Sequence, residues 1–539
     1  MTNTLTQIAS RLKQGVTPQA LPIPGTNQIE NSAGGYSFPV NDWTRLHRFL
    51  ILGTEGGSYY ATEQKLSADN ANGVMNCIQN DGPRVVREIV AISKAGRAPK
   101  NDQALFALAL CASLGDNETR KLALDALPEV ARTGTHLFHF AAFCEGARGW
   151  GRGLRRAVGR WYETMDADKL AYQALKYQAR DGWSHRDLLR LAHPKPQSEA
   201  HGILYHWMTQ GWPSVGDQPH DVESLRQIWA FERAKRAENE SEIVSLIREY
   251  KLPREGIPTQ FLTSPKVWEA LLEDMPIAAM VRNLATMTKI GLLTRTSDST
   301  KRVVSMLSDG NRIRRARLHP IAILSALTTY SSGKGVRGNA TWNPVPSVID
   351  ALDSAFYTAF GSIEPTGKRW NLALDVSGSM GAYQIAGVAG LTPRVASAAM
   401  AMVTNAVEDD VQMLAFSHEL RTLNLSRKQR LDDVLKAVDN IPMGATDCAL
   451  PMLWAAKTKA QVDVFVIYTD NETWYGQVHP VEALRRYREE SGLAAKLIVV
   501  GMVANKFSIA DPNDAGMLDV VGFDTAAPQL MSDFSLNNM

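Results

Sequence analysis

The stretch Leu372-Ala373-Leu374-Asp375-Val376-Ser377-Gly378-Ser379 decides how the last third of this 539-residue chain is expected to fold. Its apolar beginning predicts a buried strand. Three oxygen-bearing side chains, Asp375, Ser377 and Ser379, follow at alternate positions of one turn, just before a helix that we expect to begin near Met380. The turn between a strand and a helix is where an open parallel sheet places its ligands, and the first helical amides would be free to meet an anion. The pattern therefore indicates a binding site for a divalent cation.

Two later segments supply side chains of the same kind. Thr446 lies in Gly444-Ala445-Thr446-Asp447, and Asp470 ends the apolar run 464–469. Mg²⁺ prefers about six oxygen ligands and keeps several waters, so hydroxyls and carboxylates suit it. Cys448 is the only His or Cys in these motifs, which argues against zinc or a redox metal. We predict a site for a divalent cation, Mg²⁺, made by Asp375, Ser377, Ser379, Thr446 and Asp470. In the alternative interpretation, the two serines only cap a helix and the two aspartates are solvated strand ends.

The residues around these motifs predict an α/β domain. Apolar, β-branched runs at 371–376, 411–416, 462–469 and 496–503 alternate with helical segments at 393–407, 431–438 and 481–490. Strands that are buried on both faces and alternate with helices imply a mostly parallel, doubly wound sheet with helices on either side.

The middle of the chain has a different periodicity. Apolar residues at 243, 246, 247 and 250, at 268, 271, 272 and 275, and at 277, 280, 281 and 284 follow helical spacing, and prolines at 253, 258, 265 and 276 separate these segments. The stretches 103–114 and 120–131 are also helical in composition. Many short helices without intervening strands cannot each bury a face alone, so we expect an irregular, HEAT-like α-solenoid after a polar leader that ends near residue 40.

Composition restricts the class of protein. The chain has no run of about 18 apolar residues that would predict a membrane helix, and its start lacks the pattern of a secretion signal. Its four cysteines, at 77, 111, 144 and 448, are scattered without metal-ligand spacing. Such cysteines are typical of free thiols in a reducing compartment, so we expect a cytoplasmic protein.

Charge is distributed unevenly along the chain. From Asn371 to Met539 there are 13 Lys and Arg against 20 Asp and Glu, which leaves 45 basic and 36 acidic residues before that point. The front of the protein therefore carries a net charge of +9 and the back −7. A polyanion should bind to the front.

Two basic stretches in the front half are candidates for that contact. The stretch Arg148-Gly149-Trp150-Gly151-Arg152-Gly153-Leu154-Arg155-Arg156 continues to Arg160 without an acid, and Arg152, Arg156 and Arg160 would share one helical stripe. In Trp183-Ser184-His185-Arg186-Asp187-Leu188-Leu189-Arg190, Ser184 and Asp187 predict a capping box, and Arg186 and Arg190 would lie opposite the leucines. Lys176 and Arg180 lie between the two stretches. Basic helices interleaved with aromatic side chains suit RNA. In the alternative interpretation, these basic residues form a solvated helix face and pair with Glu163, Asp166, Asp168 and Asp181.

Several segments of the sequence resemble those of a known family. Four segments resemble the TROVE module of Ro autoantigens. They are Asn31-Ser32-Ala33-Gly34-Gly35-Tyr36, Arg48-Phe49-Leu50-Ile51-Leu52-Gly53-Thr54-Glu55-Gly56-Gly57-Ser58-Tyr59-Tyr60, Arg148-Gly149-Trp150-Gly151-Arg152 and Gly182-Trp183-Ser184-His185-Arg186-Asp187-Leu188-Leu189-Arg190-Leu191. Three further motifs resemble the metal-ion-dependent adhesion site of the von Willebrand factor A domain in that family: Asp375-x-Ser-x-Ser, Gly444-Ala445-Thr446-Asp447-Cys448 and Thr469-Asp470-Asn471. The chain is most similar to a bacterial Ro protein. We expect the TROVE module at residues 1–364 and the A domain at 365–539.

The resemblance implies a function. The helical repeats would close into a ring whose hole takes single-stranded ends of misfolded or structured noncoding and ribosomal RNAs, while small Y RNAs bind the basic outer surface. Bacterial members are similar to adaptors that deliver RNA to an exoribonuclease such as polynucleotide phosphorylase, in RNA quality control or processing. Carried onto this sequence, the candidate RNA-binding residues are Arg148, Arg152, Arg155, Arg156, Arg160, Lys176, Arg180, His185, Arg186 and Arg190. A packing or capping role for His185 is an equal alternative.

Two other classes of function are alternatives to a non-enzymatic RNA-binding ring. A metal-dependent nuclease or phosphatase would use Asp375 and Asp470, but the predicted site offers mostly hydroxyls and no evident general base. An adhesion module that binds only proteins, through a ligand at the metal site, disagrees with the basic front half and the missing secretion signal.

Overall fold

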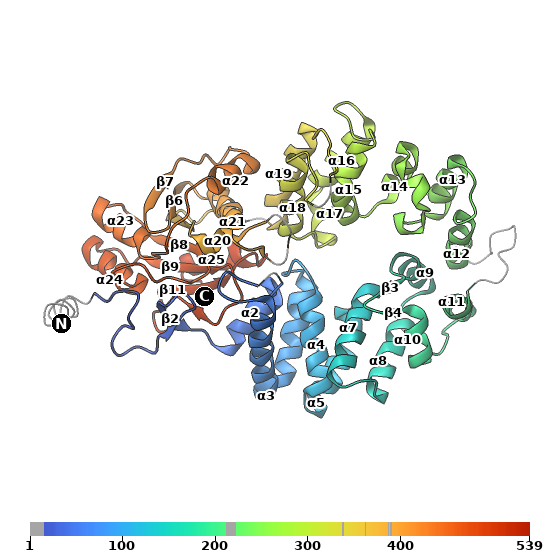
Figure 1. Cartoon of the computed structure of the whole chain (residues 1–539), viewed down its shortest axis with the longest axis horizontal. Helices are drawn as coiled ribbons and strands as arrows, with labels where there is room; N and C mark the ends of the chain where they lie inside the picture. Colours follow the sequence, from blue (N-terminus) through green and yellow to red (C-terminus); the bar gives the residue numbers. More distant parts are fainter. Residues whose placement is uncertain are drawn as a thin grey trace.

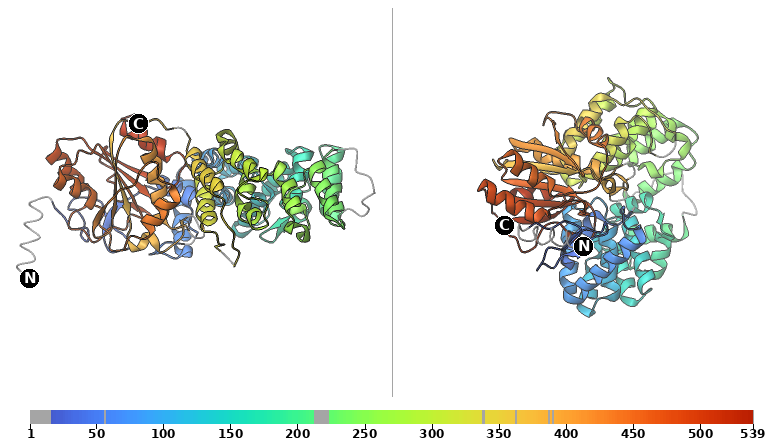
Figure 2. Two further views of the ribbon diagram at one scale, coloured as in Figure 1. Left: turned by 90° about the horizontal axis from the view of Figure 1, so that it is seen from above. Right: turned by 60° about the vertical axis from the view of Figure 1, so that its left-hand side comes forward.

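The structure is a computed structural model that describes residues 16–538, except residues 56, 212–222, 337–338, 362, 386–387 and 389–390. Figure 1 shows a curved arc of helices whose first and last members both meet an α/β unit, so that the chain closes into a ring. Seen from above in Figure 2, the helices of the arc form one layer beside the α/β unit.

The arc is an α-solenoid, as the sequence predicts. Helices that are close along the chain pack side by side, for example α2 on α3, α4 on α7, α8 on α10 and α13 on α14. Its helices are α2 (Asp42–Leu52), α3 (Glu63–Ala95), α4 (Asp102–Leu114), α5 (Asn117–Asp125), α6 (Leu127–Val130), α7 (Gly134–Ala147), α8 (Arg152–Glu163), α9 (Ala167–Lys176), α10 (His185–Ala192), α11 (Glu199–Gln210), α12 (Glu223–Ala234), α13 (Glu240–Tyr250), α14 (Pro265–Asp274), α15 (Ile277–Lys289), α16 (Asp298–Ser308), α17 (Gly310–Arg315), α18 (Pro320–Ser331) and α19 (Pro346–Ala359). Two 3-10 turns, η1 (Arg254–Gly256) and η2 (Thr259–Thr263), and a two-residue hairpin, β3 (Ala179–Arg180) and β4 (Trp183–Ser184), lie between them.

Local chemistry explains where these helices begin and break. Side-chain caps start many of them: Asp166 accepts from Lys169 N at α9, and Asn239 accepts from Glu242 N at α13. The single helix expected over 120–131 is instead the pair α5 and α6, because Pro128 fits the first turn of a new helix better than the interior of an old one. Helix α3 is likewise kinked just before Pro83.

The α/β unit has a six-stranded sheet in the order β11-β9-β8-β5-β6-β7, parallel except for β7 at one edge. The strands are β5 (Arg369–Asp375), β6 (Asp410–Phe416), β7 (Leu420–Leu423), β8 (Val464–Thr469), β9 (Lys496–Gly501) and β11 (Met517–Val521). The helices of this unit are α20 (Gly378–Gly381), α21 (Pro393–Val407), α22 (Leu431–Asp439), α23 (Leu450–Thr458), α24 (Pro480–Ser491) and α25 (Ala527–Ser535). The four predicted strands and three predicted helices are confirmed, whereas β7 and β11 were not foreseen.

Alternation along the central strands gives the sheet two buried faces. Leu372 and Leu374 of β5 join a core that includes residues of α21, while Ala373 joins a second core with residues of α23 and α24. The side chains of β8 alternate in the same way: Val466 belongs to the first core and Ile467 to the second. This doubly wound arrangement brings the carboxyl ends of the neighbouring strands β5 and β8 to one edge of the sheet.

The segment expected to be a polar leader is structured from residue 16 onward, which corrects that expectation. Residues 17–39, called the N-terminal strap below, lie on the α/β unit. The strap contains β1 (Ile29–Glu30) and β2 (Tyr36–Pro39), and β2 pairs with β10 (Phe507–Ser508) near the other end of the chain. Backbone pairing and long-range hydrogen bonds therefore fix a stretch that has little apolar periodicity of its own.

Two arginines, one of them fully buried, hold the arc to the α/β unit. The guanidinium of Arg48 in α2 is fully buried and donates to Asn505 O (3.0 Å), Phe507 O (2.9 Å) and Asp519 Oδ1 (2.5 Å). Arg97 donates to Asp524 (2.9 Å), and the carbonyl of Arg97 lies 3.1 Å from His319 Nε2, just before α18. The beginning and the end of the arc thus meet each other and the α/β unit.

Two expectations about composition can be compared with the structure. None of the helices that the structure describes is long and apolar enough to cross a membrane. All four cysteines are buried free thiols.

Candidate functional site

The predicted metal ligands lie on three loops at the carboxyl edge of the sheet. Asp375 ends β5, and Asp470 directly follows β8, the strand beside it. The loop of Thr446 is held against the first turn by a hydrogen bond from Gly378 N to Gly444 O (3.2 Å) and against the third loop by bonds from Trp474 N (3.2 Å) and Tyr475 N (3.1 Å) to Thr446 O. The structure therefore brings these three loops together.

The side-chain oxygens of the first turn face one another. Ser377 Oγ and Ser379 Oγ lie 3.1 Å apart, and Ser379 also hydrogen-bonds the Asp470 carboxylate. Asp375 accepts from Ser377 N through Oδ1 (2.9 Å) and from Thr469 Oγ1 through Oδ2 (2.7 Å). These contacts fix the rotamers of the oxygen ligands before any ion arrives.

Burial distinguishes this arrangement from its alternative interpretation. Asp375 is 0% and Asp470 2% exposed, so neither is a solvated strand end. Ser377 stands at the N-cap of α20 but makes no side-chain cap hydrogen bond. A helix begins near Met380 as predicted, but α20 is only one turn long, and the next helix of the described chain, α21, begins at Pro393.

Buried like charges give the site an unusual proton affinity. Burial and, second to it, the neighbouring Asp375 carboxylate together raise the pKa of Asp470 to about 7. Burial likewise raises the pKa of Asp375, and burial together with Asp470 raises that of Glu472 to about 8. A bound cation reverses such shifts, because it stabilises the ionised carboxylates.

The donor set fits a hard divalent cation held partly by water. Among the described residues, no group of three or more His, Cys, Asp and Glu side chains is placed to hold a metal ion. A metal here would therefore depend on the hydroxyls of Ser377, Ser379 and Thr446 together with Asp375 and Asp470, and hydroxyl and carboxylate oxygens are the ligands that suit Mg²⁺.

The structure adds residues near this edge that sequence reasoning missed. Tyr60, from the segment after α2, and Tyr383, just after α20, both have a pKa raised first by burial and then by the acids of the site. Glu472 accepts from Ser32 N (2.8 Å) and Ala33 N (3.1 Å) of the N-terminal strap. No spacing rule links residue 32 to residue 472, so only the fold could reveal this contact.

The candidate RNA-binding arginines of α8 and α10 face solvent. On α8, Arg152, Arg155, Arg156 and Arg160 are exposed, while Leu154, Ala157, Val158, Trp161 and Tyr162 are buried. On α10, which packs beside α8, Arg186 and Arg190 are exposed opposite Leu188 and Leu189. The predicted capping box is present, because Ser184 and Asp187 bond each other's backbone amides.

Among the described residues, most of these arginines have no carboxylate partner, so their guanidinium groups are available to phosphates. Arg160 pairs with Asp125 (2.5 Å), Arg180 pairs with Asp181 (3.6 Å), and Arg148 donates to Ser113 O (3.1 Å). Within the part of the chain that the structure describes, no carboxylate pairs with the five others, which we call the free arginines: Arg152, Arg155, Arg156, Arg186 and Arg190. The alternative interpretation, a solvated face, requires ion pairs with Glu163, Asp166, Asp168 and Asp181. Of these, the described part of the chain has the pair between Arg180 and Asp181.

His185 does not belong with the exposed arginines. It is 4% exposed and packs against the rings of Phe138, Trp161 and Tyr162, with its Nδ1 2.8 Å from the Tyr162 hydroxyl. Burial lowers the pKa of His185 to about 4, so the ring is neutral at pH 7. The structure favours its packing role and corrects its assignment as an RNA-contact residue.

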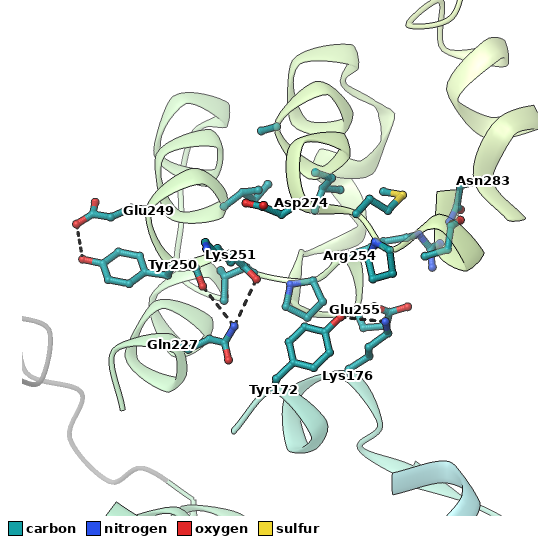
Figure 3. A pocket seen from close by; sticks show the side chains of 18 of the residues that line it. Tyr172, Lys176, Gln227, Glu249, Tyr250, Lys251, Arg254, Glu255, Asp274 and Asn283 are labelled. Carbon is teal, nitrogen blue, oxygen red and sulfur yellow. Dashed lines mark hydrogen bonds between the residues drawn. The ribbon is translucent and has the colours of Figure 1, made fainter. Parts of the chain in front are cut away.

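Lys176 lies in a separate place. It lines a cavity of about 550 Å³ between α9 and the helices α12 to α15, where its Nζ donates to the Tyr172 hydroxyl (3.0 Å), as Figure 3 shows. Gln227, Arg254, Glu255 and Asn283 also line this cavity. The sequence grouped Lys176 with the arginines because of its neighbours in the chain, but the fold separates them.

Comparison with known proteins agrees with both halves of the fold. A TROVE domain model matches residues 29–329, and a Ro60 vWA domain model matches residues 369–535. The chain is 44% identical to RNA-binding protein RO60 of Deinococcus radiodurans over 510 residues, covering 94% of this chain and 95% of that one. It is 38% identical to RNA-binding protein RO60 of Caenorhabditis elegans over 604 residues, covering 98% and 93%.

A solved structure shows the same architecture. The crystal structure of the Deinococcus radiodurans RO (RSR) protein superposes with a TM-score of 0.70 at 44% identity, covering 93% of this chain and all of that one. The family models, the two relatives and this structure account for the helical ring and the α/β unit together. The chain therefore belongs to the Ro60 family of RNA-binding proteins, with a TROVE domain followed by a Ro60-type von Willebrand factor A domain.

Proposed function

We propose that this protein holds small noncoding RNA through the exposed arginines of α8 and α10, without catalysing a reaction on it. The observation that supports this most strongly is the set of five free arginines on two adjacent helices. A guanidinium without a carboxylate partner loses no ion pair when it meets a phosphate, and two adjacent helices present several such groups at once. Membership in a family of RNA-binding proteins agrees with this use of the surface.

As the resemblance to Ro proteins implies, Y RNA would bind the exposed surface formed by α8 and α10. Single-stranded ends of misfolded or ribosomal RNAs would enter the ring. The cavity beside Lys176 would receive such an end, because its tyrosine rings can stack on bases and Lys176, Lys251 and Arg254 can meet phosphates. Four carboxylates also line this cavity: Asp168, Glu249, Glu255 and Asp274. The protein would act in RNA quality control or processing in the cytoplasm, as an adaptor that brings RNA to an exoribonuclease such as polynucleotide phosphorylase.

The A domain has a second, separate role in this proposal. Asp375, Ser377, Ser379, Thr446 and Asp470 bind Mg²⁺, and the ion supplies an open coordination position for a carboxylate from a protein partner or a neighbouring segment. Support comes from the buried cluster of oxygen ligands. The net charge of −7 from residue 371 onward makes this domain a poor place for RNA.

Binding of a small structured Y-type RNA tests the proposal. At about 150 mM salt, the double variant Arg186→Ala with Arg190→Ala should bind at least tenfold more weakly than the unaltered chain, because two phosphate contacts are lost. The matched control is Arg421→Ala with Arg427→Ala, which removes two exposed arginines from the A domain. Equal affinity of the two double variants would contradict the proposed surface.

The rival hydrolase function has its own test. Labelled RNA is incubated with the purified protein and Mg²⁺, and the products are separated by size. We expect intact RNA. Cleavage that disappears in Asp375→Ala would assign a nuclease to the metal site and overturn the adaptor role.

A further inference from the structure

We infer that Gln19 of the N-terminal strap is a positioning residue for the metal site, and that it sets the affinity for the divalent cation by holding two of the ligand loops together. This inference rests on the proposed Mg²⁺ site. It concerns a residue far from the ligands in sequence, in a stretch that carries no metal motif.

The side chain of Gln19 is completely buried between the two loops. Its amide Nε2 donates to Asp447 Oδ1 (2.8 Å) and to Val478 O (2.7 Å). Its Oε1 accepts from the hydroxyl of Thr473 and from Gly476 N (3.4 Å). Both ends of the amide are therefore satisfied by residues of the A domain, and none of these bonds is made to the strap itself.

The backbone of Gln19 reinforces this position. Its N–H donates to Gly476 O (2.9 Å), and its carbonyl accepts from Tyr36 N (2.9 Å), within the strap. At Gly476, a Cβ would come within 2.4 Å of both Asp447 Oδ1 and Gln19 Nε2. The absence of a side chain at residue 476 is what allows the strap to lie this close to the ligand loops.

The contacts of Gln19 lead directly to two metal ligands. Asp447 is the residue after Thr446, and Thr473 is three residues after Asp470. Thr473 Oγ1 also accepts from Cys448 N (3.1 Å), so the amide of Gln19 completes a hydrogen-bond network that joins the two loops. Thr446 and Asp470 can share one cation only while these loops keep their spacing.

A second part of the strap holds the loop after Asp470. Asn31 Nδ2 donates to Thr473 O (2.8 Å), and Ser37 Oγ donates to Asn471 O (3.3 Å). The strap thus holds this loop at Asn471 and Thr473. Gln19 adds a bridge to the loop of Thr446, beside the direct bonds that Trp474 N, Tyr475 N and Cys448 N make between the two loops. Partners that orient metal ligands typically contribute about 10-fold to 100-fold to metal affinity.

The test compares metal affinity in the full-length chain after removal of metal with a chelator. Mn²⁺ and Mg²⁺ are titrated by calorimetry into the unaltered protein, Gln19→Ala and Gln19→Met. Gln19→Met keeps the side-chain length and volume but removes every side-chain hydrogen bond, so it keeps the test valid if Gln19→Ala does not fold. We expect both variants to raise the dissociation constant by about 10-fold or more.

The matched control is Gln28→Ala. Gln28 belongs to the same strap, where its Oε1 accepts from Ile23 N (2.8 Å) and its Nε2 lies 3.4 Å from His479 Nδ1, and it does not contact the loops of Thr446 and Asp470. This variant should keep the dissociation constant within about twofold, the usual spread for a site away from the ligands.

Thermal unfolding of the metal-free proteins separates positioning from simple attachment of the strap. A lower Tm in Gln19→Met with an unchanged dissociation constant would contradict the inference while leaving the metal site intact. No heat of binding in the unaltered protein would instead refute the proposed metal site, and the inference with it. Weaker binding in Gln28→Ala equal to that in Gln19→Met would also overturn the assignment, because the effect would then belong to the strap as a whole.

Discussion

Among single residues, Asp470 shows most clearly how burial prepares a side chain for a cation. Its carboxylate is 2% exposed and lies beside Asp375, and its pKa is raised to about 7. A carboxylate with this proton affinity is partly neutral near pH 7 unless a positive charge is present. Proton and cation therefore compete for the same site.

The first prediction follows from that competition. The affinity for Mg²⁺ should rise with pH and level off above about 7, where Asp470 is already ionised. Well below this pH, the affinity should fall by up to about tenfold per pH unit, the limit for release of one proton. Calorimetric titration of Mg²⁺ from pH 5 to pH 8.5 or so measures it, and a flat profile would contradict the raised pKa.

The stability of the metal-free protein should change in the opposite direction. The pKa of Asp470 is raised above its ordinary value, so the folded chain holds this proton more tightly than the unfolded chain. Below the ordinary value of 3.8 the two states bind it equally, and stability is lost as pH rises from there toward about 7. In Asp470→Asn this part of the pH dependence should disappear, as thermal unfolding at several pH values would show.

Single residues also show where sequence reasoning stops. The pattern at Asp375, Ser377 and Ser379 was sufficient to predict a cluster of oxygen ligands, because strand ends and turns have local signatures. His185 was not resolved by its neighbours, because its position at a helix start is compatible with both a surface and a core. The contacts of Phe138 and Tyr162 decide that it is in the core, and those residues are distant in the chain.

At the scale of elements, α10 depends on its first turn to present Arg186 and Arg190. The capping box of Ser184 and Asp187 satisfies amides at the start of this eight-residue helix, and a helix so short is marginal without such help. Its two leucines supply the packing that fixes the other face.

Ser184→Ala tests this dependence. Loss of a cap costs about 0.5–2 kcal/mol, so the amides of α10 should exchange with solvent faster, in proportion to that loss. Ser198→Ala, which removes the cap of α11, is the matched control and should speed exchange in α11 but not in α10. Unchanged exchange in α10 of Ser184→Ala would show that packing alone maintains the helix. Hydrogen exchange followed by mass spectrometry gives both values.

Periodicity predicted most elements but missed those without a strong pattern of their own. The spacing of apolar residues located α13, α14 and α15 and the central strands, since each buries a continuous face. The edge strand β7 is four residues long and half exposed, so it lacks the apolar run that marks a buried strand. The N-terminal strap has the composition of a polar leader, and hydrogen bonds to the A domain, which local periodicity cannot reveal, hold it in place.

In the whole molecule, two kinds of contact join the ring to the A domain. Arg48 is buried and makes several hydrogen bonds. At the other end of the arc, Asp350 of α19 pairs with Arg430 of the A domain (2.7 Å), and both of these side chains are well exposed. Removing one partner of a buried pair leaves the other charge without compensation, and an exposed pair contributes little.

We therefore predict different effects for two matched variants. Arg48→Met should destabilise the protein by about 3–5 kcal/mol and produce a separate, earlier unfolding transition in calorimetry. Arg430→Met should cost less than about 1 kcal/mol and leave the unfolding profile unchanged. Equal effects of the two substitutions would mean that burial of Arg48 is not what couples the two halves.

The division of charge agrees with a division of work between the halves. The helical front of the chain is basic and carries the free arginines, while the α/β back is acidic and carries the cluster of oxygen ligands. We therefore expect the front half to hold RNA electrostatically, independently of the metal site.

The salt dependence of RNA affinity shows whether the front half alone holds the RNA phosphates. For the unaltered chain, for Arg152→Ala with Arg156→Ala, and for Asp375→Ala, the dissociation constant for one structured RNA is measured over a range of salt concentrations. Each phosphate contact contributes a slope of about −0.7 to −0.9 to log affinity against log salt. The arginine variant should therefore have a slope smaller in magnitude by about 1.4 to 1.8 and a weaker affinity, while Asp375→Ala should match the unaltered chain. An unchanged slope in the arginine variant, or loss of RNA binding in Asp375→Ala, would contradict the account.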